Sequence, residues 1–87
     1  MACYVYVLGS EGGGKCGDYR TYVGWTTDLV ARLEKHNSGS GARATRGRNW
    51  QLLYAERYLN RGEAMSREWH IKRDRNFRGC LRANWRG

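Results

Sequence analysis

Residues 19–37 of the sequence read YRTYVGWTTDLVARLEKHN, and this stretch joins a strand pattern to the start of a helix. Residues 19–25 are mostly aromatic or β-branched, which is typical of a strand. The three residues that follow all offer side-chain oxygens suited to a helix N-cap: Thr26, Thr27 and Asp28. Leucines and strong helix formers come next, so we predict a helix over about residues 29–36 that ends near Asn37.

A glycine interrupts the predicted strand just before the helix begins. Gly24 weakens a strand, and such a glycine is typical of a place where a backbone or a ligand must approach closely. Arg32 and His36 follow on the helix, and residues four apart share one helix face. The segment therefore predicts that the phenol of Tyr22, the guanidinium of Arg32 and the imidazole of His36 lie near one another.

The elements outside this segment are predicted from similar signals. In chain order they are a strand over 3–8, a glycine-rich hairpin connection over 9–17, a glycine-rich basic loop over 38–49, a strand over 51–58, a helix capped by Asn60 and running to about Lys72, and a short helix over 77–85. The connection over 9–17 is too short for a crossover helix, so the first two strands should form an antiparallel hairpin.

Length and charge restrict the function. The chain has 87 residues, so we expect a single domain over 1–87 with a shallow surface site rather than a deep cavity. The net charge of +8 is uneven: residues 1–31 carry two basic and three acidic side chains, and residues 32–87 carry 14 basic, mostly arginine, and five acidic ones. Arginine matches phosphate oxygens with two hydrogen bonds, so a nucleic acid is the expected partner. An acidic membrane surface is the weaker alternative.

The lack of recognisable targeting signals and the cysteine pattern lead us to expect an intracellular protein. No window resembles a membrane span and the first residues lack signal-peptide features, so we expect a cytoplasmic protein with no membrane contact. The three cysteines contain no C-x-x-C pair, which favours reduced thiols. A zinc site built from these cysteines with His36 or His70 is the less favoured hypothesis.

Five motifs in order resemble the GIY-YIG endonuclease domain family, specifically its small stand-alone bacterial members, which are related to structure-specific nucleases. They are YVY (4–6), YVG (22–24), T-x-D-L-x-x-R-L-x-x-H-N (26–37), G-x-G-A-x-x-T-R (39–46) and A-x-x-x-E-x-x-I-K (64–72). YVY stands in place of the GIY of the first motif. The resemblance implies an α+β fold with a small three-stranded antiparallel sheet flanked by helices, which agrees with the predicted order of elements.

The resemblance also implies a set of site residues and a metal-dependent cleavage of DNA. The residues at matching positions are Tyr6, Tyr22, Arg32, His36 and Glu68 as catalytic groups, with Gly24 as the motif glycine, which is expected to contact the nucleic acid. Glu68 is the expected ligand of Mg²⁺ or Mn²⁺, ions that keep several waters and need few protein carboxylates. The general base stays open among Tyr22, Tyr6 and His36. Structure-specific cutting in repair or recombination is the setting that the resemblance implies.

Basic residues outside the catalytic set are expected to contact phosphates. They are Arg43, Arg46 and Arg48 in the glycine-rich loop, with Lys72, Arg73, Arg75 and Arg78 near the end of the second helix and beyond it. DNA is expected ahead of RNA, and a separate targeting protein is a further expected partner, while the oligomeric state stays open. A non-catalytic nucleic-acid-binding module is the alternative. Trp50, Trp69 and Trp85 are candidates for stacking on unpaired bases, although most tryptophans are expected in the core or as a lid over the sheet.

Overall fold

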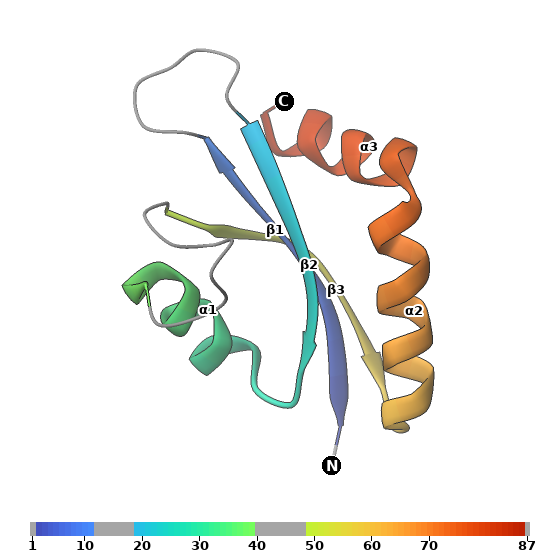
Figure 1. Ribbon diagram of the computed structural model, residues 1–87. Coiled ribbons are helices and arrows are strands. Elements are labelled where there is room, and N and C mark those ends of the chain that lie inside the picture. The colour runs from blue at the N-terminus through green and yellow to red at the C-terminus, as the bar shows by residue number, and fades with distance from the viewer. Residues whose placement is uncertain (1, 12–18, 40–48, 87) are drawn as a thin grey trace.

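The computed structural model describes residues 2–11, 19–39 and 49–86, which form three strands and three helices (Figure 1). The elements are β1 (Cys3–Glu11), β2 (Tyr19–Thr26), α1 (Leu29–Ser38), β3 (Gln51–Tyr58), α2 (Arg61–Arg73) and α3 (Arg75–Arg86). The predicted α+β class, with a three-stranded antiparallel sheet flanked by helices, is confirmed.

The first strand of the chain lies in the middle of the sheet. The strand order is β2-β1-β3, and both neighbours pair with β1 antiparallel, as predicted for the hairpin of β1 and β2. Tyr6 lies opposite Gly24 in this hairpin. The prediction that β1 ends at Leu8 is wrong, because pairing with β2 continues through Gly9 to Glu11. Pairing with Thr21 on β2 thus keeps Gly9 in the strand, although glycine alone favours the end of a strand.

Alternate side chains of β1 face two different helical layers, as the period of a strand requires. Cys3, Val5 and Val7 pack with Ala64 and Ile71 of α2 on one face of the sheet. On the other face, two buried side chains of β1 and Trp50 pack with leucines of α1; these residues are Tyr6, Leu8, Leu29 and Leu33. Figure 1 shows α1 on one side of the sheet and α2 with α3 on the other.

Side-chain caps fix where the helices begin. The Asp28 carboxylate accepts a hydrogen bond from the Ala31 amide at 3.1 Å, and the Asn60 side chain caps α2. Gly39 ends α1 with φ of 84°, a left-handed conformation that favours glycine. The last helix begins at Arg75, two residues before the prediction, because the Asp74 carboxylate accepts from the Phe77 amide at 2.9 Å.

No helix within the described ranges is long and apolar enough to cross a membrane.

Candidate active site

A cleft of about 310 Å³ opens along β2, which is an edge strand of the sheet. Residues from four elements and one connecting residue line it. They are Tyr6 from β1, Tyr22, Gly24, Trp25 and Thr26 from β2, Thr27 between β2 and α1, Arg32 from α1, and Glu68 from α2. The edge position explains this mixture, because helices on opposite faces of the sheet can both reach past its last strand. Five of the six residues predicted for the catalytic set and its motif glycine therefore line one cleft.

The sixth, His36, lies buried behind the cleft and contacts Tyr6. A hydrogen bond of 2.9 Å joins Tyr6 Oη to His36 Nε2, and both residues are at most 2% exposed. Burial, with a smaller contribution from Arg32, lowers the pKa of His36 below its usual value. Burial raises the pKa of Tyr6, and the nearby Tyr22 raises it further. Both groups are therefore neutral at pH 7, and the pair fixes the position of the Tyr6 ring.

A close approach does occur at Gly24, but the approaching group is the Tyr6 side chain and not a backbone or a ligand. A Cβ atom built on Gly24 would lie 2.6 Å from Tyr6 Oη and 2.8 Å from Tyr6 Cζ. The backbone conformation of Gly24 needs no glycine, since Gly39 is the one described glycine with positive φ. The steric need is thus specific: glycine leaves room for the ring that hydrogen-bonds His36. Contact between Gly24 and DNA stays a prediction.

Tyr22 is half-buried between His36 and Trp50. Its ring centroid lies 4.9 Å from that of His36 and 6.3 Å from that of Trp50. Burial raises the pKa of the Tyr22 phenol, and the negative charge of Glu68 raises it further, while Arg32 opposes both. The proton affinity of Tyr22 consequently depends on the charge at Glu68.

Arg32 and Glu68 bring opposite charges to the cleft from opposite faces of the sheet. The Glu68 side chain is 21% exposed, and its carboxylate lies 3.8 Å from the ammonium group of Lys72 one turn later on α2. Arg32 is half-buried on α1. A phosphate in the cleft would meet a fixed cation on one side and, on the other, a carboxylate able to hold a cation.

The donor atoms around Glu68 fit a hard divalent cation. Oxygen atoms of one carboxylate, phenols and threonine hydroxyls line the cleft, and Mg²⁺ or Mn²⁺ prefers oxygen and retains water. The described residues contain no group of three or more His, Cys, Asp or Glu side chains placed to hold a metal. Water and phosphate oxygens would therefore complete most of the coordination. Cys3 lies in the core on the other face of the sheet, so the described residues give no support to a zinc site.

The predicted phosphate contacts are only partly described. Arg43, Arg46 and Arg48 lie outside the described residues. The other predicted contacts near the end of α2 are exposed, namely Lys72, Arg73 and Arg75. Arg78 is half-buried instead, because its guanidinium donates to Thr21 Oγ1 at 3.2 Å and to the Lys72 carbonyl at 3.0 Å. Arg78 therefore joins α3 to β2 and α2.

One side chain that was not predicted, that of Asn37, joins α1 to the residue before β3, beside the cleft. The Asn37 amide accepts from the Trp50 backbone N–H at 2.5 Å and donates to the Trp50 carbonyl at 3.1 Å. Trp50 is 4% exposed and lies edge-on to Tyr22, so the prediction of core packing holds for it. Asn37 lies in the last turn of α1 and its partner lies 13 positions later, so no local sequence pattern signalled this contact.

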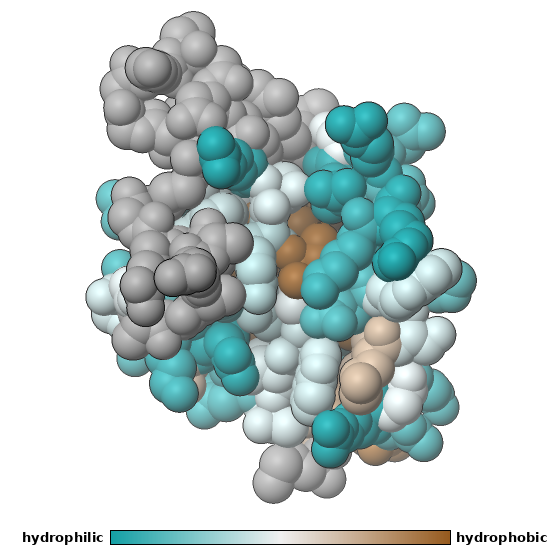
Figure 2. Space-filling model, viewed as in Figure 1, coloured by the Kyte–Doolittle hydropathy of each residue, from teal (hydrophilic) through white to brown (hydrophobic). Residues whose placement is uncertain are grey.

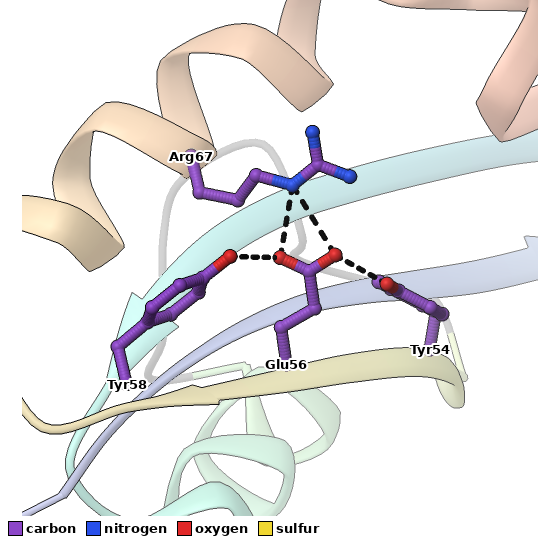
Figure 3. Close-up of polar contacts among 4 residues, drawn as sticks. All are labelled: Tyr54, Glu56, Tyr58 and Arg67. Atoms are coloured by element: carbon purple, nitrogen blue, oxygen red, sulfur yellow. Dashed lines mark hydrogen bonds and ion pairs between the residues drawn. The ribbon is translucent and has the colours of Figure 1, made fainter.

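A second polar cluster, also missed, joins β3 to α2 (Figure 3). The Glu56 carboxylate accepts hydrogen bonds from Tyr54 Oη, from Tyr58 Oη at 2.6 Å, and from Arg67 Nε at 2.9 and 3.2 Å. Burial alone would raise the pKa of Glu56, but Arg67 and the two phenols outweigh it, and the pKa is lowered. The Y-x-E-x-Y spacing on a strand, which puts all three side chains on one face, was the available signal.

Comparison with known proteins places this geometry in a family. The family model described as the GIY-YIG catalytic domain matches residues 2–80. A UPF0213 protein of Clostridium perfringens is 46% identical over 71 residues, covering 80% of this chain and 70% of that protein. A UPF0213 protein of Oceanobacillus iheyensis is 41% identical over 70 residues, covering 79% and 74%. The solution NMR structure of a UPF0213 protein from Bacillus halodurans is similar with a TM-score of 0.50 and 36% identity, covering 95% of this chain and 84% of that one.

Proposed function

The chain belongs to the GIY-YIG catalytic domain family, and from this membership we propose that it is an endonuclease that hydrolyses DNA phosphodiester bonds with a divalent cation at Glu68. The observation that carries the proposal is the convergence of Tyr22, Arg32 and Glu68, from three separate elements, on one cleft. Hydrolysis of a phosphodiester needs positive charge at the non-bridging oxygens and a group that accepts the proton of the attacking water.

Arg32 and Glu68 supply the charge that the reaction needs. Arg32 brings a guanidinium cation to the cleft, and a guanidinium can stabilise negative charge on the phosphate through paired hydrogen bonds. Glu68 would hold Mg²⁺ or Mn²⁺, and such a cation neutralises charge on the phosphate oxygens and lowers the pKa of a bound water.

Tyr22 is the best placed of the three candidates for the general base. Tyr6 lines the cleft, but its hydroxyl is bonded to His36 and the residue is 2% exposed, while His36 is 1% exposed, so Tyr22 is the more accessible group. Tyr22 lines the cleft and is half-buried. Neutralising the charge of Glu68 removes one of the causes that raise the pKa of Tyr22, while Arg32 continues to lower it. Tyr6 and His36 then act as positioning residues.

Exchange of Glu68 tests the proposal directly. Glu68→Gln keeps size and helix propensity but removes the charge that binds a hard cation, so cleavage should fall by about two orders of magnitude or more at every Mg²⁺ and Mn²⁺ concentration. DNA affinity in EDTA should be retained or increased, because a carboxylate near the phosphate has been removed. Glu34→Gln makes the same charge change at an exposed position of α1 and should cleave like the parent protein.

A second substitution tests the cation on the other side of the cleft. Arg32→Ala should lower cleavage by about a hundred- to a thousandfold with a much smaller loss of affinity, as for other donors to transition-state charge. Arg57→Ala, at an exposed position of β3, is the control. Parental cleavage by both Glu68→Gln and Arg32→Ala would contradict the proposal. Tight DNA binding by the parent with no cleavage at any metal concentration would favour the non-catalytic binding module instead.

A further inference from the structure

A large aromatic side chain is exposed on α2 next to the cleft. Trp69 is 53% exposed, although an indole ordinarily contributes a large buried area. The Arg73 guanidinium lies 3.8 Å from the centroid of the Trp69 ring, and its Nη1 donates to the Trp69 carbonyl at 3.3 Å. The guanidinium therefore restrains the ring and places a positive charge beside it. More than half of the residue's surface stays exposed to a ligand.

Helix geometry places Trp69 on the flank of α2 that continues outward from Glu68. Residues three and four apart on a helix are neighbours, so Met65, Glu68, Trp69 and Lys72 occupy adjacent positions of one flank. The ion pair of Lys72 with Glu68 belongs to this flank, and Met65 is 44% exposed. Figure 2 shows near-neutral side chains and an apolar one among the hydrophilic ones over α2, beside the β2 edge. A nucleotide next to the phosphate in the cleft would therefore reach the indole.

The surroundings of the ring favour a nucleic acid as its ligand. Exposed cations follow the ring along the chain, namely Lys72 and Arg73 on α2, with Arg73 over the ring, and Arg75 at the start of α3. An aromatic ring beside cations is the combination by which proteins bind single-stranded nucleic acid, with the base stacked on the ring and the backbone beside the charges. In a duplex the faces of the bases are covered by their neighbours, so only an unpaired base can use the ring.

From this arrangement we propose that Trp69, held by Arg73, is a stacking platform for an unpaired base, and that it selects DNA in which an unpaired strand borders a duplex. This inference rests on the proposed endonuclease function, because it specifies the substrate class of the same cleft. The platform contributes binding energy to branched or flapped DNA and none to fully paired DNA. A protein ligand would instead need a wider apolar surface than one indole and Met65 provide.

Binding in EDTA with a fluorescent base tests the platform without any cleavage. The probes are a duplex with an unpaired strand that carries 2-aminopurine beside the junction, and a fully paired duplex of equal length. Trp69→Ala should weaken binding of the branched probe by about ten- to a hundredfold, which is the range for loss of one base stack, and leave the paired probe unchanged. The quenching of 2-aminopurine seen with the parent should be lost.

Two further variants separate stacking from other effects. Trp69→Phe keeps an aromatic face and should retain most of the preference for the branched probe. Met65→Ala removes apolar surface from the same flank and should bind both probes like the parent. Equal losses on both probes for Trp69→Ala, or a loss for Met65→Ala as large as for Trp69→Ala, would overturn the inference.

The two proposals fail in distinguishable ways. A parent protein that never cleaves but shows a Trp69-dependent preference for the branched probe would overturn the endonuclease and leave the platform standing. A parent that cleaves with Mg²⁺ but binds branched and paired probes equally well in EDTA would overturn the platform alone.

Discussion

Among single residues, Gly24 matters most to the geometry of the site, because it has no side chain where the Tyr6 ring lies. Tyr6 and Gly24 are cross-strand partners, and the phenol of Tyr6 lies where a Cβ of residue 24 would be. The same phenol is bonded to His36 from the helix. Gly24 therefore leaves room for the one tyrosine ring that joins the sheet to α1.

Gly24→Ala should displace that ring. The clash at 2.6 Å involves a ring held by a buried hydrogen bond, so the free energy of unfolding should fall by about 1 to 3 kcal/mol, as for other overpacked cores. Urea denaturation measures the loss. Gly79→Ala on α3 is the matched control, since its Cβ meets nothing within 4 Å and alanine favours a helix. Equal unfolding midpoints for Gly24→Ala and the parent would show that Tyr6 can move at little cost.

His36 should make stability depend on pH. The pKa of His36 is lowered in the folded state. Below about pH 6.5 the imidazole therefore binds a proton in the unfolded chain more readily than in the folded protein. Stability should be full above about pH 6.5 and decline as the pH falls toward the folded pKa. Urea midpoints between about pH 7.5 and about pH 5 test this dependence.

The matched variants for this experiment are two glutamines. His36→Gln should flatten the decline between about pH 6.5 and about pH 5, whereas His70→Gln, at an exposed position of α2, should keep it. A decline that is the same in both variants would assign the pH dependence to other groups.

Residue chemistry could be predicted from the sequence only where contacts are local. Arg32 and His36 lie on one helix, so their spacing alone predicted that they share a face. The N-cap was narrowed only to three neighbouring residues, of which Asp28 is the cap. The bond between Tyr6 and His36 spans 30 positions and depends on how α1 lies on the sheet. The family resemblance supplied Glu68, whereas a lone carboxylate on a helix carries no local signal of its role.

At the scale of the element, α2 is held against the sheet by a polar contact as well as by its apolar side chains. Arg67 and Glu68 are consecutive, yet the first reaches Glu56 on β3 and the second lines the cleft at β2. The helix thus spans the sheet, and a change in its rotation would move both side chains.

Glu56→Gln should weaken the docking of α2. The two phenols and the Arg67 guanidinium would then face a neutral amide instead of a carboxylate. Buried hydrogen bonds to a charged partner contribute about 1.5 to 3 kcal/mol each to stability. The Arg67 side chain is 39% exposed, and solvent screening reduces its share, so we expect a total loss of about 1 to 2 kcal/mol. Thermal or urea unfolding measures it, with Glu34→Gln as control. A loss equal to that of the control would show that the cluster adds nothing beyond packing.

Element boundaries were predicted less well than element types. The strand β1 runs three residues further than predicted because β2 continues to pair with it. The start of α3 depends on the Asp74 carboxylate, whereas the backbone N–H of the same residue donates to the Ile71 carbonyl where α2 ends. Both errors arise where a cross-strand partner or one side chain outweighs local propensity.

At the scale of the whole molecule, the net charge of +8 should govern affinity for DNA. Each phosphate contact releases counterions, so the logarithm of the binding constant should fall steeply and linearly with the logarithm of salt concentration. Replacing Arg43, Arg46 and Arg48 together by alanine should lower that slope by about 2 to 3 without changing the preferred sequence. Titrations in EDTA at several salt concentrations measure the slope, with Arg57→Ala as control. A slope near zero for the parent would exclude a polyanion as partner.

The order β2-β1-β3 also sets the timing of assembly as the chain emerges from the ribosome. The central strand is synthesised first and finds β2 within the first 26 residues, but its other edge waits for residues 51–58. Until then β1 presents an open edge on which a second nascent chain could add a strand. Glu68 arrives later still, on α2. The cleft is therefore lined completely only after α2 has docked on the sheet, so a chain that ends before Glu68 lacks one wall of it.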